Sequence, residues 1–319
     1  MDRRDSLLAA LVACLWGFNF VVIDWGMRDM PPLLFLAIRF VVVLVPAVFL
    51  LPKPDAPWTV ILAIGATMSL GQFGFLYVGL DSGMPAGLAG LVLQAQVPAT
   101  ILLAALVLRE RPNRRQVLGV LLGVAGLLVV ALGRGGHVPI GALLLCLAAA
   151  ASWSVGNVIT RRARVAGGLS LTVWSALIVP VPLFVLSLLV DGPAAVGDGL
   201  ASFSWQTGLS TLYTAGLSSL LGYGIFNSLL ARNPSSAVVP WILLVPPVAI
   251  VSAWVLLDER PNGAELIGGA VLVAGVLVAT ALASSTSRPA RPMPSADDEP
   301  DRPGSAHLPA GAAHAEGPS

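Results

Sequence analysis

The larger polar side chains inside the long apolar runs of this sequence are nearly all neutral, and most of them are amides. An amide offers hydrogen-bond donors and an acceptor, but it supplies neither a permanent charge nor a nucleophile. Together with nearby aromatic rings, which offer stacking faces, such residues suit recognition of a polar small molecule better than covalent catalysis. The candidate binding residues of this kind are Asn19, Gln72, Gln94, Gln96, Trp153, Asn157, Trp174, Tyr223 and Asn227.

Each amide also has a structural explanation, because amides inside membranes often join two helices by a hydrogen bond. Several of the set are expected to line a binding path even if any one of them does not. Gln94 and Gln96 would point about 200° apart on a regular helix. We therefore expect at most one of these two to face the centre of a cavity.

Arg39 is the cation that lies well inside an apolar run, about six residues or roughly 9 Å beyond its start. Its side chain could reach back to the membrane interface, hold a substrate carboxylate, or brace the end of a helix. The sequence leaves these three roles open.

The residues that metal enzymes and hydrolases need are not clustered here. The three histidines are His137 in a short link and His307 and His314 near the carboxyl terminus, and no GxxxxGK[ST] phosphate loop occurs. Cys14 and Cys146 sit singly in apolar runs, where a thiol behaves as a small hydrophobe. We expect no catalysis, no metal, no cofactor and no nucleic-acid partner.

The composition places these side chains in a membrane, because 56% of the 319 residues are hydrophobic and only 11% are charged. The mean hydropathy is +0.85. Runs of about 17 to 25 apolar residues are long enough to cross a bilayer. Ten such spans are predicted, at residues 7–27, 33–51, 58–80, 86–108, 116–132, 141–160, 171–190, 206–230, 236–257 and 264–283.

The two ends of the chain differ in character. The first apolar run continues past any small-residue cleavage site, which predicts a retained helix rather than a secretory signal. Residues 284–319 are rich in Pro, Ser, Ala and Gly, so we expect a disordered tail.

Basic residues indicate the orientation. Without the tail, 11 Lys and Arg residues fall on the side of the amino terminus and 3, namely Arg28, Arg134 and Arg260, on the other. The positive-inside rule then places both termini in the cytoplasm of a bacterial-type inner membrane.

The sequence repeats itself at an offset of 149 residues. "LRERPN" at 108–113 aligns with "LDERPN" at 257–262, and 14 of the 32 positions from 98 to 129 are identical without a gap. This predicts two five-helix repeats, at 1–135 and 136–283. Because five is odd, the second repeat enters the membrane from the opposite side, so the repeats are inverted.

Inverted repeats are typical of secondary transporters, in which the two halves exchange conformations around a site near the middle of the membrane. The alternative is a scaffold or sensor in which the duplication has no mechanical role. Prolines inside spans remove backbone hydrogen bonds. We expect Pro98, Pro246 and Pro247 to act as hinges, although proline in a membrane helix can be a simple kink.

A proton-coupled pump for cationic drugs is expected to carry a carboxylate near the middle of the membrane. The acidic residues of this chain lie toward span ends or in links. A neutral, amide-lined cavity with one arginine suits a small zwitterion better. Broad efflux of toxic compounds remains the second hypothesis.

The chain also resembles the EamA branch of the drug/metabolite transporter superfamily, over residues 1–283. Four stretches look similar to bacterial exporters of O-acetylserine and cysteine: "MPPLLFLAIRF", "GMPAGLAGLVLQAQ", "WSALIVP" and "LLGYG". The resemblance implies an all-α polytopic membrane protein of ten helices that exports small metabolites, such as these amino acids, by alternating access. We expect a monomer or a weak homodimer.

Overall fold

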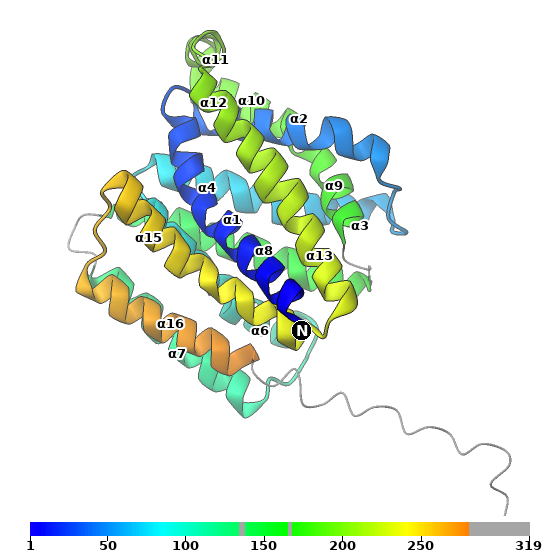
Figure 1. Cartoon of the computed structure of the whole chain (residues 1–319), viewed down its shortest axis with the longest axis vertical. Helices are drawn as coiled ribbons and strands as arrows, with labels where there is room; N and C mark the ends of the chain where they lie inside the picture. The colour runs from blue at the N-terminus through cyan, green and yellow to red at the C-terminus, as the bar shows by residue number, and fades with distance from the viewer. Residues whose placement is uncertain (134–137, 165–167, 281–319) are drawn as a thin grey trace, which may run out of the picture. The chain divides into compact units, whose positions relative to one another are not determined.

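The computed structural model describes residues 1–133, 138–164 and 168–280, and all regular secondary structure in them is helical (Figure 1). The predicted tail at 284–319 and His137, His307 and His314 lie outside the described residues. The first half contains α1 (Arg3–Met27), α2 (Pro32–Leu50), α3 (Trp58–Ile64), η1 (Gly65–Gly71), α4 (Gln72–Asp81), α5 (Ala86–Val92), η2 (Leu93–Ala95), α6 (Gln96–Val107) and α7 (Arg114–Gly133). The second half contains α8 (Ile140–Ala163), α9 (Leu169–Ser175), η3 (Ala176–Ile178), α10 (Pro180–Val190), α11 (Gly192–Ala201), α12 (Trp205–Leu212), η4 (Tyr213–Gly222), α13 (Tyr223–Arg232), α14 (Ser235–Val238), η5 (Val239–Leu244), α15 (Val245–Leu257) and α16 (Gly263–Thr280).

Within these residues, eight helical runs are long and apolar enough to cross a membrane, and the bent pair α9 and α10 raises the number to nine. The chain is therefore an all-α, multi-pass membrane protein. The predicted span 206–230 is helical through α12, η4 and α13, but it does not meet the same apolar criterion. It is rich in Ser, Thr, Gly and Tyr, which lower its hydropathy. The number of ten spans stays a prediction.

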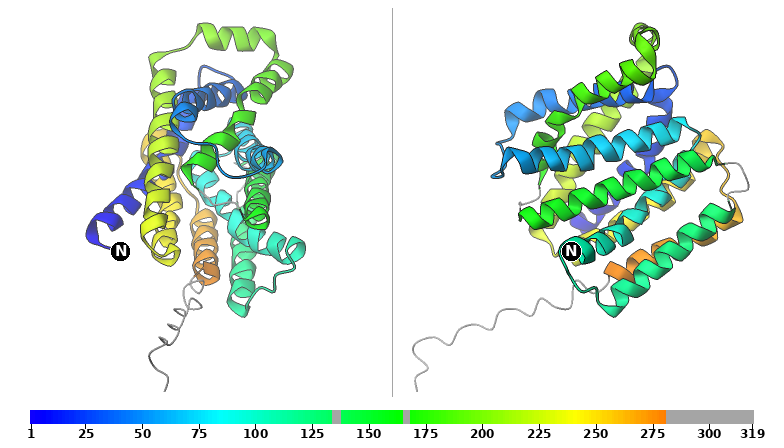
Figure 2. Two further views of the ribbon diagram at one scale, coloured as in Figure 1. Left: turned by 90° about the vertical axis from the view of Figure 1, so that its right-hand side faces the viewer. Right: turned by 180° about the vertical axis from the view of Figure 1, so that it is seen from behind.

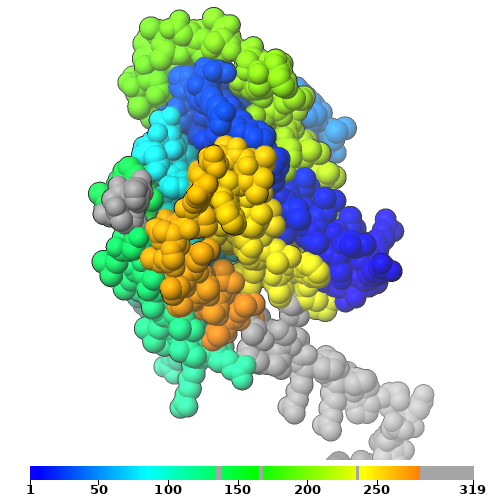
Figure 3. Space-filling model, turned by 60° about the vertical axis from the view of Figure 1, so that its left-hand side comes forward, coloured from blue at the N-terminus to red at the C-terminus, as the bar shows by residue number. Residues whose placement is uncertain are grey.

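The helices pack into one bundle whose long members cross at a range of angles (Figure 1). One set consists of α1 with α15 on one side and η4 on the other, and a second consists of α8 between α4 and α6. Figure 2 shows the second set from behind. Helices α7 and α16 form a closely packed pair beside both sets, and Figure 3 shows the face where α1, α15 and α16 adjoin. Because the chain crosses the bundle alternately, the start of α1, the α6–α7 link and the end of α16 share one end, here called the N-terminal end.

The repeated hexapeptides form the same kind of turn. Arg109 and Asp258, the second residues of the two copies, both adopt the left-handed backbone conformation, with φ of 56° and 60°. This conformation ends a helix by letting the following N–H groups bond back to its last carbonyls. Aspartate tolerates it better than most side chains do. The letter that differs between the copies therefore occupies a helix-terminating position in both.

The last residue of each hexapeptide begins the next helix. Asn113 Oδ1 accepts from the backbone N–H of Gln116, and Gln116 Oε1 accepts from that of Asn113, both at 2.9 Å. Asn262 and Glu265 make the same reciprocal pair at 2.8 and 3.0 Å. Each pair is a capping box, in which two otherwise unpaired N–H groups at a helix start are satisfied. The repeated letters thus specify a compact corner between two helices.

Prolines explain where two long helices change their winding. Pro98 has no N–H for the carbonyl four residues earlier, and the 3-10 turn Leu93–Ala95 spans that point. In the second half, Pro246 and Pro247 follow the 3-10 segment Val239–Leu244. The two breaks coincide at the 149-residue offset.

Wide π-helical turns also occur in both halves, as Gly65–Gly71 and Tyr213–Gly222. At the 149-residue offset, the first of these falls inside the second. A π turn leaves carbonyls outside the usual i to i−4 pattern and often lies at a functional site. The irregular turns of the two halves are therefore arranged alike.

One helix was not anticipated from the sequence. The short helix Gly192–Ala201 lies between α10 and α12, at the opposite end of the bundle from residue 1 (Figure 1). It packs through Val196 and Gly199, and a Cβ on Gly199 would lie 2.9 Å from Cδ of Pro31. With ten residues, this helix is too short to be predicted as a membrane span.

Glycines allow α7 and α16 to approach backbone to backbone. A Cβ on Gly126 would lie 2.5 Å from the carbonyl oxygen of Gly268 and 2.6 Å from the nitrogen of Leu272. A Cβ on Gly119 would meet the carbonyl oxygen of Gly275 at 2.5 Å. Such small-residue contacts replace the hydrophobic driving force that helices lack inside a bilayer.

We predict that Gly126→Ala lowers the unfolding free energy by about 1–3 kcal/mol, since backbone atoms that cannot move aside oppose the added methyl. The control is Gly141→Ala, because a Cβ there meets nothing within 4 Å. Thermal unfolding of the two purified variants in detergent measures the difference. A Gly126→Ala melting temperature equal to that of wild type would contradict the close approach of the two helices.

Candidate functional site

A cavity of about 680 Å³ lies between the two sets of helices. This volume is typical of a site for a small molecule. Residues from both halves of the chain line it, among them Phe20, Leu76, Ala150 and Val245. The lining extends to Gln116, the third residue of α7, and Thr280, the last residue of α16. The cavity therefore reaches the N-terminal end of the bundle.

The structure brings most of the predicted binding residues to this cavity. Eight of the ten predicted side chains line it: Asn19, Arg39, Gln72, Gln94, Gln96, Trp153, Asn157 and Tyr223.

Trp174 and Asn227 are not among the lining residues. Trp174 donates from Nε1 to the carbonyl oxygen of Leu51 at 3.0 Å and packs against Trp58 at a centroid distance of 5.9 Å. This places it beside the α2–α3 link. Asn227 is half-buried on α13, whereas its neighbour Phe226 faces the cavity. Residue type alone did not distinguish these two positions from the others.

Both Gln94 and Gln96 line the cavity. The expectation that at most one of them faces its centre stays a prediction. That expectation assumed a regular α-helix, whereas Gln94 lies in the 3-10 turn just before Pro98. A 3-10 turn has 3.0 residues per turn instead of 3.6, which brings residues two apart closer to a common face.

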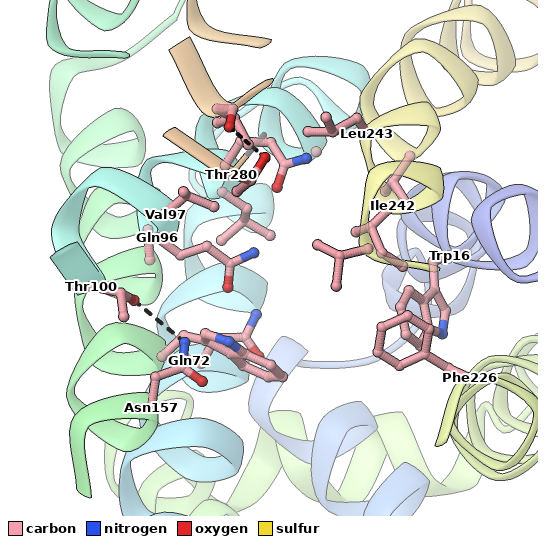
Figure 4. Close-up of a pocket in the computed structure, with 18 of the residues that line it drawn as sticks. Trp16, Gln72, Gln96, Val97, Thr100, Asn157, Phe226, Ile242, Leu243 and Thr280 are labelled. Carbon is pink, nitrogen blue, oxygen red and sulfur yellow. Dashed lines mark hydrogen bonds between the residues drawn. The ribbon is translucent and has the colours of Figure 1, made fainter. Parts of the chain in front are cut away.

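One wall of the cavity is polar (Figure 4). Asn157 Nδ2 lies 3.4 Å from Oγ1 of Thr100, and Gln96 projects beside them. The hydroxyl of Ser154 donates to the backbone carbonyl of Gln96 at 2.9 Å and so holds the broken segment against α8. Thr100 was missed from the sequence. Its spacing of four residues from Gln96 on a helix is the signal that could have found it.

The facing wall is aromatic (Figure 4). The ring of Trp16 lies 5.0 Å from that of Tyr223 and 5.3 Å from that of Phe226. Trp16 Nε1 donates to the carbonyl oxygen of Ser218 at 2.9 Å, within the π-helical segment η4. The wide turn thus supplies the acceptor that fixes the orientation of the indole.

Arg39 lies beside the cavity with 2% of its surface exposed. Its Nη1 donates to the hydroxyl of Tyr77 at 2.8 Å and its Nη2 to the hydroxyl of Ser219 at 2.9 Å. The guanidinium carbon is 4.6 Å from the centre of the Phe73 ring, within the range of a cation–π interaction. The side chain therefore does not reach back to the membrane interface.

The opposite end of the bundle is closed where α5 packs on α15. The Glu259 carboxylate accepts from the backbone N–H groups of Ala86 and Gly87 at 2.9 and 3.0 Å. Because this carboxylate is largely buried in the α15–α16 link, its pKa is raised above the usual range, although the two N–H bonds oppose the shift. In the first repeat, Glu110 instead accepts from Arg161 at 2.8 Å on the exposed surface.

A bundle of apolar helices around a cavity that has one polar wall and reaches one end defines a membrane carrier for small molecules. The chain belongs to the EamA-like transporter family, whose model matches residues 5–132 and again residues 140–281. A solved crystal structure with 23% sequence identity superimposes with a TM-score of 0.51 over 89% of this chain and 98% of the other. It shares the fold.

Curated relatives cover most of the chain. A "probable amino-acid metabolite efflux pump" of Salmonella typhimurium is 43% identical over 87% of this chain and 95% of its own length. The Escherichia coli protein of the same name is 41% identical with the same coverage. A "probable terminal-alkyne amino-acid exporter" of Streptantibioticus cattleyicolor is 32% identical over 61% of this chain and 64% of its own length.

The position of the cavity can be tested by labelling single introduced cysteines. The background is a chain in which Cys14 and Cys146 are replaced by alanine. Cysteine at Thr100 should react quickly with a water-soluble maleimide, because Thr100 faces the cavity. Cysteine at Leu91 is the control, since Leu91 is 1% exposed in the closed half of the same span. We expect labelling at least about tenfold faster at position 100. Equal rates would contradict a cavity open at the N-terminal end.

Proposed function

We propose that this protein exports small zwitterionic amino-acid metabolites, such as cysteine or O-acetylserine, across the inner membrane by alternating access. The observation that supports this most directly is the chemistry of the cavity lining. Among the described lining residues, the polar side chains are mainly amides and hydroxyls, the permanent charge is Arg39, and no carboxylate is present. The names of the curated relatives agree with an amino-acid substrate.

The same lining argues against the second hypothesis, broad efflux of lipophilic cations. A cation entering the cavity would meet the Arg39 charge where solvent screening is weak. Without a carboxylate to offset that repulsion, binding would be unfavourable. Anionic and zwitterionic molecules do not meet this obstacle.

The proposed orientation places both termini in the cytoplasm, on the positive-inside count of 11 against 3 basic residues. The cavity then reaches the cytoplasmic side, as loading of an export substrate requires. The α5–α15 contact would be the closed exterior gate.

We propose that residues 1–135 and 136–283 act as two inverted repeats that exchange conformations. Two features support this: the family model matches each half separately, and the proline and π-helical breaks recur at one offset. At the exterior side α5 packs on α15, whereas at the cytoplasmic side Thr100 and Ile101 of α6 and Val239 and Pro240 of η5 line the cavity. Exchange of the two arrangements would close the cytoplasmic end and open the other, with Pro98, Pro246 and Pro247 at the bends.

The function is tested by export from proteoliposomes preloaded with labelled cysteine or O-acetylserine. We expect flux above empty vesicles that falls at least about tenfold in Gln96→Ala and Asn157→Ala, because each removes hydrogen-bonding groups from the cavity. Gln206→Ala is the matched control, since Gln206 is an exposed amide on α12.

Flux of neither compound, with wild-type protein correctly inserted, would overturn the amino-acid assignment. Flux of lipophilic cations in its place would favour drug efflux. Flux of no tested solute would favour the scaffold or sensor hypothesis.

The exterior gate gives a further prediction. Glu259→Ala removes both acceptors of the Ala86 and Gly87 N–H groups, so it should increase the population open to the exterior. Cysteine at Leu91 then reports the opening as a labelling rate raised several-fold, about what a loss of 1–2 kcal/mol produces. Glu259→Gln keeps one acceptor and should show a smaller increase. An unchanged rate in both variants would contradict a gate at this position.

A further inference from the structure

Three buried polar atoms lack a hydrogen-bond partner within the described residues, and all three belong to side chains that line the cavity. They are Oδ1 of Asn19, Nε of Arg39 and Oε1 of Gln72. The side chains are 93% or more buried, with exposures of 7%, 2% and 6%. An unpaired buried polar atom typically costs about 1–3 kcal/mol. Three such atoms on side chains that line one cavity point to a ligand that satisfies them once the side chains turn toward it.

Arg39 is the charged side chain of the three. A guanidinium has five N–H donors and no acceptor, and here two hydrogen bonds, to Tyr77 and Ser219, engage it. Neither partner is charged, and none of the ion pairs in the described residues involves Arg39. The Phe73 ring offsets part of the charge through its face. Among the described residues, no carboxylate pairs with the Arg39 guanidinium.

Asn19 and Gln72 each have an unpaired acceptor, whereas Arg39 has an unpaired donor. Their oxygens are acceptors without a donor, and they come from α1 and from the first residue of α4. An ammonium group offers three N–H donors and no acceptor. It matches two amide oxygens as a carboxylate matches a guanidinium.

We propose, as a refinement that rests on the proposed function, that this cavity recognises the α-carboxylate of an amino acid at Arg39 and its α-ammonium group at Asn19 and Gln72. An Arg–carboxylate pair can be bidentate, which adds directional specificity to the charge. The substrate side chain then faces the wall formed by Trp16, Tyr223 and Phe226, which accepts varied small groups. Specificity would thus be strict for the zwitterionic head and loose for the side chain.

Other ligand classes satisfy only part of the set. A phosphate or simple carboxylate could pair with Arg39, but it would leave the amide oxygens without donors. A primary amine could engage the oxygens, but it would leave Arg39 unpaired and would be repelled by it. A zwitterion can pair with all three atoms, and both of its charges then have a partner in the site.

The first arm of the test needs no variant. Competition against labelled L-cysteine is measured in reduced proteoliposomes with L-cysteine, with cysteamine, which lacks the carboxylate, and with 3-mercaptopropionate, which lacks the ammonium group. We expect each truncated compound to compete at least about 100-fold less well, as is typical when a site built to bind a polar group meets an analogue without it. Equal competition by either compound would overturn the corresponding half of the assignment.

The second arm assigns the residues. Arg39→Lys keeps the charge but loses the planar fork, and Arg39→Gln loses both. The preference for cysteine over cysteamine should fall in that order, while the preference over 3-mercaptopropionate remains. Asn19→Leu and Gln72→Leu should show the reverse pattern. Preferences that do not change in any of these variants would contradict the residue assignment.

A third measurement separates recognition from a structural role. Because Asn19→Leu and Gln72→Leu remove an unpaired acceptor, the empty proteins should melt at or above the wild-type temperature, and cysteine should no longer raise it. A structural role predicts a lower melting temperature with the cysteine effect retained. This result would overturn the proposal even if Arg39→Gln did not fold.

The failure of this inference differs from the failure of the proposed function. Cysteine export that is inhibited equally by cysteamine, with Arg39→Gln unchanged in preference, would reject the head-group assignment and keep the function. Absence of any amino-acid flux or binding in wild-type protein would reject both.

Discussion

The scarcity of water inside a bilayer constrains every part of this structure. Backbone N–H and C=O groups in hydrocarbon must be paired within the protein, so spanning segments are helical, and irregular backbone is tolerated where it adjoins a cavity. Of the five irregular turns in the described residues, η1 and η3 contribute no cavity residue, and the other three follow this rule. The 3-10 turns η2 and η5 and the π turn η4 each contribute residues to the cavity lining. These three breaks thus lie where polar groups are useful.

The two ERPN corners have the same local structure at opposite ends of the bundle. Both combine a residue in the left-handed backbone conformation with a capping box. These two features depend on local backbone geometry and not on the neighbouring helices. The glutamates that follow the left-handed residues have different partners: Glu110 pairs with an arginine at the surface, and Glu259 with N–H groups at the start of α5. An exposed ion pair contributes little stability, and at Glu259 the burial that raises the pKa of the carboxylate opposes the gain from its two N–H bonds. Equivalent glutamates therefore have different partners at the two ends of the bundle.

The sequence predicted much of this arrangement because periodicity and cost in hydrocarbon are local properties. Apolar runs located the helices, and polar side chains too costly to face lipid located eight cavity residues. What the residue pattern could not show depended on three-dimensional context. Trp174 and Asn227 have suitable chemistry but face other neighbours, and the relation of Gln94 to Gln96 followed from a 3-10 turn whose winding the pattern of residues did not reveal. The short helix α11 was too brief to register as a span.

In the proposed mechanism, Arg39 would link substrate recognition to the conformational exchange. It belongs to α2 in the first half, yet its two hydrogen bonds go to Tyr77 in that half and to Ser219 in the second. A substrate carboxylate at the guanidinium would compete with, or reorient, the contact that joins the halves. Because arginine keeps its charge under all ordinary conditions, the guanidinium would favour an anionic partner in both proposed conformations. Substrate binding at Arg39 would then shift the equilibrium between the two conformations only if the Arg39–Ser219 contact differs between them.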